Sequence, residues 1–378
     1  MNGCMKLCRF WIAFAALLLG HTLAGAQPAG EQPVKIPLQL VKDEEGHWRV
    51  GILVSLGNGT PILCELDTGN AAFYAAINNH PTAARPDWWG NFTPVSPARS
   101  GSVKYTSGIN YDYQVVQTSV TLTAVDGTRV TAADVEMGRI TKGYGGDLGD
   151  AGANKWDKMI ADNQPPLHGV FWGNFGGRLN GQEGLAVILG QFPGLFGKGF
   201  AIHLGEFSHP EPYLMLGVND AERARYPLAA AMVPLLDKSG QPLKFPHTGL
   251  PHYEPMPLRA TYRLGNGAEA DTLANLPTLF DTGAPRVNIR TSVPRRLVER
   301  GLVRDNTPFQ MTLAGAGTPD VVLDFRVGQT SSLNEVHVAE NNDTDEVNAG
   351  LTPYFYFDIL YDIEKGVVRF RPRAATAQ

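Results

Sequence analysis

Leu66-Asp67-Thr68-Gly69 decides the fold of this chain, because Phe280-Asp281-Thr282-Gly283 repeats it 214 positions later (281 − 67). Each copy follows one apolar run and precedes another. A single Asp-Thr-Gly triplet is a common turn sequence, and two unrelated turns are the simplest alternative. The matching flanks instead predict two related halves that each bring one Asp to a shared site, where close carboxyl groups hold one proton between them.

The repeat extends beyond the two triplets. Phe73 and Ala75 follow the first Asp by six and eight positions. Val287 and Ile289 follow the second Asp at the same spacing. Apolar residues two positions apart are typical of a strand with one face turned inward. The pattern indicates two lobes of duplicated origin.

The first 26 residues have the layout of a secretory signal peptide. Lys6 and Arg9 precede an apolar run over 10–19, and Ala24-Gly25-Ala26 supplies small residues for cleavage. The run is too short for a permanent membrane span, although a failure of cleavage would leave the chain anchored. We therefore expect an exported protein, periplasmic or secreted, with no permanent span after cleavage.

The composition of the remaining chain favours two globular domains, predicted at 27–217 and 218–378. Removal of Lys6 and Arg9 changes the formal net charge from −5 to −7 (−5 − 2). No basic stripe interleaved with aromatic residues occurs, which argues against a nucleic-acid partner. Cys64 is the one remaining cysteine, so an internal disulfide is impossible and a large core must provide stability. We expect its thiol to be buried in that core.

Short β-branched and aromatic runs, separated by turn residues, predict a mainly β fold. The 42 glycines and 27 prolines supply those turns, and Asn58-Gly59 predicts a tight hairpin. Helical patterns are confined to 155–161, 221–226 and 293–300. Positions 141–185 predict a long surface insertion, which either covers a cleft or is an irregular loop without a role.

The two Asp loops suggest a specific chemistry. In a close pair, the protonated carboxyl can polarise a carbonyl while the ionised one takes a proton from water, and the two titrate as one unit. The glycines permit close approach because they lack a Cβ, and the threonine hydroxyls can hydrogen-bond to the opposite loop. The catalytic residues are thus predicted to be Asp67 and Asp281, and the loop-supporting residues to be Thr68, Gly69, Thr282 and Gly283.

Other kinds of site have little support in the sequence. The nine histidines lack zinc-ligand spacing. Neither a Gly-x-Ser-x-Gly elbow nor a phosphate-binding glycine loop occurs. We expect no metal and no cofactor.

With these residues in view, the chain resembles the bilobal, pepsin-like aspartic proteases over most of its mature length, as an exported member of bacterial type. Residues 51–61 and 66–69 resemble the opening hairpin and first catalytic loop of that family, and 350–370 resembles its C-terminal segment. The resemblance implies a mainly β, two-lobed, pepsin-like acid protease fold. It also implies an active-site cleft between the lobes, with Asp67 and Asp281 as the catalytic pair.

Val103-Lys104-Tyr105-Thr106-Ser107-Gly108 resembles the flap, the hairpin that closes over substrate in this family. Tyr105 would take the place of the flap tyrosine, and the alternative is a strand aromatic without that role. The flap residues predicted to contact substrate are Tyr105, Ser107 and Gly108. Ile188-Leu189-Gly190, or else Phe171-Trp172-Gly173, resembles the element that supports the first loop, and Ala349-Gly350 resembles the support of the second.

The chain departs from the family pattern just after each triplet. The family places Ser or Thr there, whereas this chain has Asn70 and Ala284-Pro285. Loss of a hydrogen bond to an ionised carboxylate raises its pKa. We therefore predict activity at a higher pH than in the acid enzymes of the family.

The resemblance implies an aspartic endopeptidase that acts as a monomer on a peptide or protein substrate. Water would attack the scissile carbonyl directly, without a covalent intermediate. One alternative is a catalytically weak or inactive binding or inhibitor protein on the same scaffold, which the altered residues after the triplets would favour. A further alternative is a processing enzyme with a single client.

Overall fold

A computed structural model gives the fold. Every element described belongs to one compact unit, Pro33–Gln378. The predicted signal peptide lies outside the described residues. The structure describes residues 32–77, 88–149, 155–181, 185–205, 210–267, 270–292, 296–328, 332–340 and 344–373.

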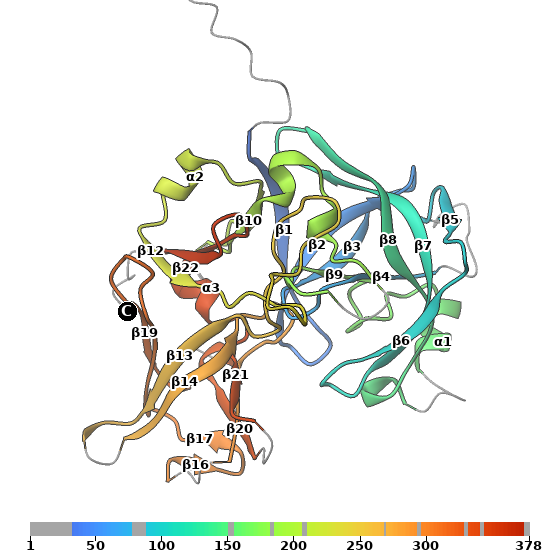
Figure 1. The fold of residues 1–378 in the computed structure, drawn as a ribbon. Coiled ribbons are helices and arrows are strands. Elements are labelled where there is room, and N and C mark those ends of the chain that lie inside the picture. The colour runs from blue at the N-terminus through green and yellow to red at the C-terminus, as the bar shows by residue number, and fades with distance from the viewer. Residues whose placement is uncertain are drawn as a thin grey trace, which may run out of the picture. The chain divides into compact units, whose positions relative to one another are not determined.

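The fold is mainly β, as the sequence predicts, and the described strands form two sheets (Figure 1). The first sheet has 14 strands: β1 (Val34–Lys42), β2 (Trp48–Leu56), β3 (Ile62–Asp67), β4 (Phe73–Ala76), β5 (Phe92–Pro94), β6 (Ser100–Lys104), β7 (Asn110–Thr123), β8 (Arg129–Tyr144), β9 (Gly173–Gly176), β10 (Gly199–His203), β11 (Tyr213–Leu216), β12 (Leu228–Ala231), β22 (Phe357–Asp362) and β23 (Val367–Pro372).

The second sheet has nine strands, all from the C-terminal half of the chain. They are β13 (Leu258–Leu264), β14 (Asp271–Leu279), β15 (Val287–Thr291), β16 (Val298–Glu299), β17 (Leu302–Val303), β18 (Pro308–Leu313), β19 (Val321–Arg326), β20 (Val336–Glu340) and β21 (Glu346–Asn348). The first sheet extends past residue 217, because β22 pairs with β10 and carries β23 and β12 beside it.

The two Asp loops share one strand arrangement. The first loop connects β3 to β4, and β9 lies between them, parallel to β3 and antiparallel to β4. The second loop follows β14 and leads to β15, and β21 lies between them, parallel to β14 and antiparallel to β15. The next neighbours also correspond, since β4 pairs in parallel with β8 and β15 with β20. The repeat seen in the sequence is therefore a repeat of topology.

Burial follows the predicted spacing after each Asp. Phe73, Ala75, Val287 and Ile289 are all at most 1% exposed. In β15 the buried positions alternate with partly exposed ones. In β4 all four residues are buried, because Phe73 and Ala75 belong to the main core while Tyr74 belongs to a second core on the other face.

Helices are few and short among the described residues. They comprise α1 (Lys155–Ala161), α2 (Asp220–Ala224), α3 (Pro353–Tyr356) and the 3₁₀ turns η1 (Gly146–Leu148), η2 (Leu189–Gln191), η3 (Gly194–Gly197) and η5 (Ser332–Asn334). Within this described set, no helix has the length and apolar character that a membrane crossing requires. The helix predicted at 155–161 is confirmed, and the one predicted at 221–226 is the shorter α2, capped by Asn219.

The helix predicted over 293–300 is wrong where the structure describes it. Residues 293–295 lie outside the description, and the rest form a turn followed by β16, which pairs antiparallel with β17. Arg300 and Gly301 join these strands with φ angles of +52° and +80°. Two consecutive positive φ angles are typical of a two-residue hairpin turn, so turn chemistry prevails here over the helical pattern.

The segment 141–185 is only partly the surface insertion that the sequence predicts. Its first residues complete β8, and its later part contains β9, which is fully buried between the strands of the first Asp loop. The surface portion holds η1 and α1, and α1 packs against β8 (Figure 1). β2 and β3 form the predicted hairpin, but their last paired residues are Val54 and Ile62, so the connection is longer than the tight turn predicted at Asn58-Gly59. Cys64 is fully buried, as expected.

Candidate active site

The two Asp loops meet at their glycines. A Cβ placed on Gly69 would lie 2.4 Å from Asp281 Oδ2, and a Cβ placed on Gly283 would lie 2.6 Å from the Asp67 carboxyl carbon. No residue with a side chain fits at either position without displacing the opposite carboxyl group. Both Gly-to-carboxylate contacts run from one half of the chain to the other, so the triplets form a single site.

The two threonines join the loops by reciprocal hydrogen bonds. Thr68 N–H donates to Thr282 Oγ1 at 3.1 Å, and Thr282 N–H donates to Thr68 Oγ1 at 2.9 Å. Each hydroxyl then donates to a carbonyl of the opposite loop, Thr68 to Phe280 O at 2.8 Å and Thr282 to Leu66 O at 2.5 Å. Both threonines are buried, so these four bonds hold the relative positions of the loops.

One oxygen of each carboxyl group is bound within its own loop. Gly69 N–H donates to Asp67 Oδ1 and Gly283 N–H donates to Asp281 Oδ1, both at 2.8 Å. The two aspartates are 7% and 8% exposed, so solvent reaches each of them only narrowly. The backbone therefore orients both side chains in the same way.

Two asparagines that the sequence did not single out bind the other carboxyl oxygens. Asn174 Nδ2 donates to Asp67 Oδ2 at 2.7 Å, and Asn348 Nδ2 donates to Asp281 Oδ2 at 2.6 Å. Asn174 lies on β9 and Asn348 ends β21, so each comes from the strand inserted beside its Asp loop. A signal for them exists in the sequence, because both begin an Asn-x-Gly triplet (174–176 and 348–350).

Hydrogen bonds to the amide oxygens fix the orientation of both asparagines. Asn174 Oδ1 accepts from Asn70 Nδ2 at 2.7 Å, and Asn348 Oδ1 accepts from Gly350 N–H at 2.9 Å. Each amide nitrogen must then face its aspartate. The residues after the triplets therefore leave neither carboxylate without a donor: Asn70 acts through Asn174, and a backbone N–H serves the second loop, where Ala284 has no polar side chain.

Burial raises the pKa of Asp67 well above its ordinary value. The neighbouring charges of Asp281 and then Glu65 raise this pKa further, as does a side-chain hydrogen bond with Asp281, while the hydrogen bond from Asn174 opposes the shift. A carboxyl group in this setting keeps a proton at a pH where a solvated Asp is ionised. The pair can therefore hold one proton between two carboxyl groups.

Arg49 is a buried cation that binds both Glu65 and the second Asp loop. Arg49 Nη1 donates to Glu65 Oε1 at 3.2 Å and to Gly283 O at 2.5 Å, and its Nε donates to Asp43 Oδ2 at 2.9 Å. His168 Nε2 lies 3.6 Å from Glu65 Oε2. Arg49 thus neutralises two buried carboxylates and joins the N-terminal strands to the second Asp loop.

The predicted flap residues lie at the tip of the β6–β7 hairpin. Tyr105 N–H donates to Ile109 O at 2.8 Å, and Gly108, at φ +86°, closes the turn. The Tyr105 ring packs 5.2 Å from that of Tyr111, and its hydroxyl is buried without a hydrogen-bond partner. Burial raises the pKa of Tyr105, and the charges of Tyr111 and Asp67 raise it further. Ser107 is exposed.

The elements beside the Asp loops differ in part from those expected. β9, at 173–176, pairs with the first loop, so Phe171-Trp172-Gly173 precedes the supporting strand and overlaps it by one residue. Ile188-Leu189-Gly190 is not that strand, although Ile188 N–H donates to Ala71 O at 3.3 Å. Ala349-Gly350 lies beside the second loop as expected, where Asp281 N–H donates to Gly350 O at 3.3 Å.

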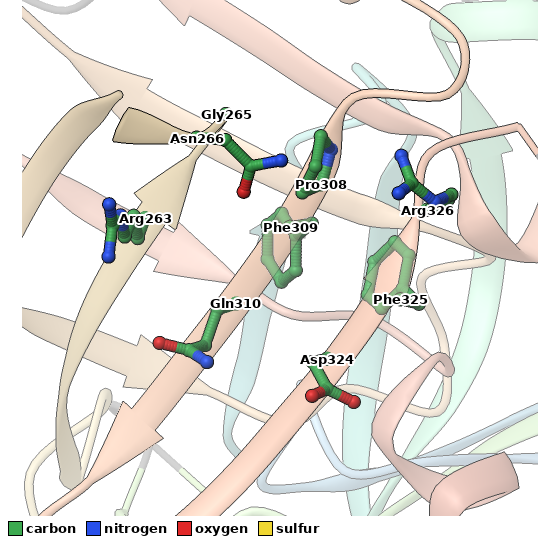
Figure 2. Close-up of a pocket in the computed structure, with 9 residues that line it drawn as sticks. All are labelled: Arg263, Gly265, Asn266, Pro308, Phe309, Gln310, Asp324, Phe325 and Arg326. Carbon is green, nitrogen blue, oxygen red and sulfur yellow. The ribbon is translucent and has the colours of Figure 1, made fainter. Parts of the chain in front are cut away.

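A separate pocket of about 410 Å³ lies on the second sheet, around the strands β13, β18 and β19 (Figure 2). None of its lining residues belongs to an Asp loop or to the flap. Phe309 and Phe325 both line it, and their rings stack with centroids 4.6 Å apart. The remaining lining residues are Arg263, Gly265, Asn266, Pro308, Gln310, Asp324 and Arg326.

The chain matches no protein-family model, and no curated protein is significantly similar to it. The geometry of the site is therefore the basis for a functional conclusion. Two carboxyl groups that can hold one proton between them, each held by a backbone N–H and an amide, can act as one general base and one general acid on the same water and carbonyl.

Proposed function

We propose that this protein is an aspartic endopeptidase with a pepsin-like, two-lobed fold. The observation that carries the proposal is the pair of Asp-Thr-Gly loops, which come from opposite halves of the chain and place each glycine against the other Asp. The common strand arrangement around both loops supports the proposed fold. Because both loops belong to one chain, the proposed enzyme acts as a monomer.

The proposed reaction uses the dyad as one acid–base unit. The ionised carboxylate takes a proton from a bound water, whose oxygen attacks the scissile carbonyl carbon. The protonated carboxyl group donates its proton to the carbonyl oxygen, which gives a neutral tetrahedral diol. The carboxyl group that now holds the proton gives it to the leaving nitrogen, and the other carboxylate takes a proton from a hydroxyl of the diol. The C–N bond breaks, the product carboxylic acid and amine form, and the dyad again holds one proton. No bond forms between the protein and the substrate.

The hydrogen bonds from Asn174 and Asn348 favour an active dyad over an inactive scaffold. A binding or inhibitor protein would not need oriented donors on the outer carboxyl oxygens, Asp67 Oδ2 and Asp281 Oδ2. The higher working pH predicted from the sequence remains a prediction, but its physical basis changes. Burial and the charges of Asp281 and Glu65 raise the pKa of Asp67, whereas no donor has been lost.

Proposed substrates are extended peptide segments that the Tyr105 hairpin covers. Export, which the layout of residues 1–26 supports, would place these substrates outside the cytoplasm. A protease restricted to one client would share this chemistry and differ in its range of substrates.

Cleavage of a peptide library between about pH 3 and 8, the range of carboxyl and His titrations, tests the proposal. Asp67→Ala and Asp281→Ala should each lower kcat/KM by about 10³-fold or more, and the double variant should be no worse, because the pair acts as a unit. Asp324→Ala removes an exposed carboxylate of the second sheet and should leave activity unchanged. A tetrahedral-mimicking hydroxyl peptide should inhibit the wild type. Absence of cleavage, or full activity in both Asp67→Ala and Asp281→Ala, refutes the proposed endopeptidase activity. The alternative is then a binding or inhibitor protein on the same scaffold.

A further inference from the structure

Arg178 lies two residues after the end of β9, beside the first Asp loop. Its backbone N–H donates to Asn70 O at 3.0 Å, which fixes the start of its side chain. Its guanidinium donates from Nη1 to Gly69 O at 3.1 Å and from Nε to Pro255 O at 2.9 Å. Because a Cβ on Gly69 would lie 2.4 Å from Asp281, the contact with Gly69 places the guanidinium close to the dyad.

This guanidinium forms no ion pair with any carboxylate of the described chain. Both of its hydrogen bonds go to neutral carbonyl oxygens, although a guanidinium has five N–H donors. The charges of Asp281, Asp67 and Glu346 act on it from beyond ion-pair distance. Glu346 is already paired with Arg290 at 3.0 Å. Burial lowers the pKa of Arg178, so these distant charges do not offset its loss of water.

Three arginines of the described chain with little exposed side-chain surface differ from the half-buried Arg178, because each has a carboxylate partner. Arg49 binds Asp43 and Glu65, and Arg223 binds Asp362 at 2.9 Å. Arg373 lies 2.9 Å from Asp358. A guanidinium removed from water is costly unless a carboxylate accompanies it. Arg178, beside the dyad, has no carboxylate partner among the described residues.

Further polar atoms without partners lie in the segment that follows Arg178 and in a second segment bound to it. Tyr253 N–H donates to Leu179 O at 3.0 Å, which sets the segment 252–255 beside the segment 178–181. In these two segments Asn180 Oδ1 and His252 Nε2 are buried without a hydrogen-bond partner. Buried polar atoms normally have partners, so both atoms are available for a hydrogen bond to water or to a further polar group.

We propose that Arg178 binds a carboxylate of the substrate, so that the enzyme prefers peptides with an acidic group close to the scissile bond. This inference rests on the proposed function and narrows it to acidic peptides. The carboxylate would form two parallel hydrogen bonds with the free guanidinium N–H groups, the geometry that favours arginine over lysine. Either an Asp or Glu side chain or a free peptide C-terminus would supply it.

Peptide binding to an Asp281→Asn background measures this preference without requiring turnover. The probes are ten-residue peptides that carry one Glu at each position in turn, the matched Gln peptides, and both sets with free or amidated C-termini. On Asp281→Asn alone, we expect one Glu position, or the free C-terminus, to bind about tenfold more tightly than its neutral counterpart. The position identifies which source provides the carboxylate.

Two changes at Arg178 and one matched control locate the effect. Arg178→Gln should abolish the preference for the acidic peptide, while Arg178→Lys should keep part of it and make it more sensitive to salt. Arg263→Gln removes an equal charge from the pocket on the second sheet and should preserve the full preference. Thermal unfolding checks that each variant is folded. If Arg178→Gln is not folded, the partial loss of the preference in Arg178→Lys is the test.

The outcomes separate this inference from the proposed function. Equal affinity for the Glu and Gln peptides at every position, or a preference that survives in folded Arg178→Gln, overturns the role of Arg178 even if the wild type cleaves peptides. A preference that Arg178→Gln removes supports it, even if the wild type cleaves nothing and the endopeptidase proposal fails.

Discussion

At the scale of single residues, the amide donors on the dyad decide how easily it ionises. Asn174→Leu and Asn348→Leu keep the approximate side-chain volume but remove the N–H from the outer carboxyl oxygen. Loss of a donor to the ionised form raises a carboxyl pKa. We expect kcat/KM to fall about tenfold and the acidic limb of its pH profile to move to higher pH.

The control for this change is Asn266→Leu, an exposed asparagine of the pocket on the second sheet. It should alter neither the rate nor the profile. A purely structural role for Asn174 would lower the amount of folded enzyme without moving the acidic limb of the pH profile. An unmoved limb in both Asn174→Leu and Asn348→Leu therefore contradicts the prediction.

Ionisation of Asp67 should cost stability. Its pKa is raised in the folded state, so the folded chain holds this proton more tightly than the unfolded chain does. The stabilising contribution is present below the unfolded pKa of about 3.9 and is lost as pH rises through the raised folded value. Asp67→Asn lacks this loss. Its free energy of unfolding relative to wild type should therefore increase between pH 4 and pH 7, by about 1.4 kcal/mol for every tenfold difference in proton affinity between the folded and unfolded chains.

Urea unfolding at the two pH values measures this difference. Asp324→Asn, at an exposed position, should show the same offset from wild type at both pH values. If the offset of Asp67→Asn is also independent of pH, the carboxyl group is not the buried acid that the structure indicates.

At the scale of elements, α1 supports the hairpin that carries Tyr105. Trp156, 2% exposed, packs against Gly143 of β8 and lies 5.7 Å from the Tyr111 ring, which in turn contacts Tyr105. Trp156→Ala opens a cavity worth about 3–5 kcal/mol. We expect a severalfold rise in KM and faster hydrogen exchange in β6 and β7. Trp48→Ala, a partly buried tryptophan of β2, should leave exchange in that hairpin unchanged.

The sequence predicts elements well where local pattern and tertiary environment agree. The Asp loops and their flanking strands were found because apolar spacing marks both. β9 was missed as a strand because Gly173-Asn174-Phe175-Gly176 has two glycines and no β-branched residue. Its conformation comes from pairing with β3 and β4 on either side. For the same reason the contact between Asn174 and Asp67, 107 positions apart, has no local signal.

At the scale of the whole described fold, Arg49 couples the two halves of the chain to the dyad. It reaches Gly283 O, 234 positions away, while neutralising Asp43 and Glu65. Both carboxylates are buried, at 8% and 2% exposure. The charge of Glu65 also raises the pKa of Asp67. Stability and acid–base behaviour should therefore change together when this cation is removed.

Arg49→Met should destabilise the fold by about 3–5 kcal/mol, because it removes the guanidinium that binds two buried carboxylates. Where enough protein remains folded, the acidic limb of kcat/KM should move to higher pH, since Glu65 then acts on Asp67 without compensation. Adding Glu65→Gln should restore part of both properties, a coupling that a double-mutant cycle measures. Arg290→Met breaks the more exposed pair with Glu346 and should cost less than about 1 kcal/mol. Additive effects of Arg49→Met and Glu65→Gln would show that the two residues act independently and that the network does not tune the dyad.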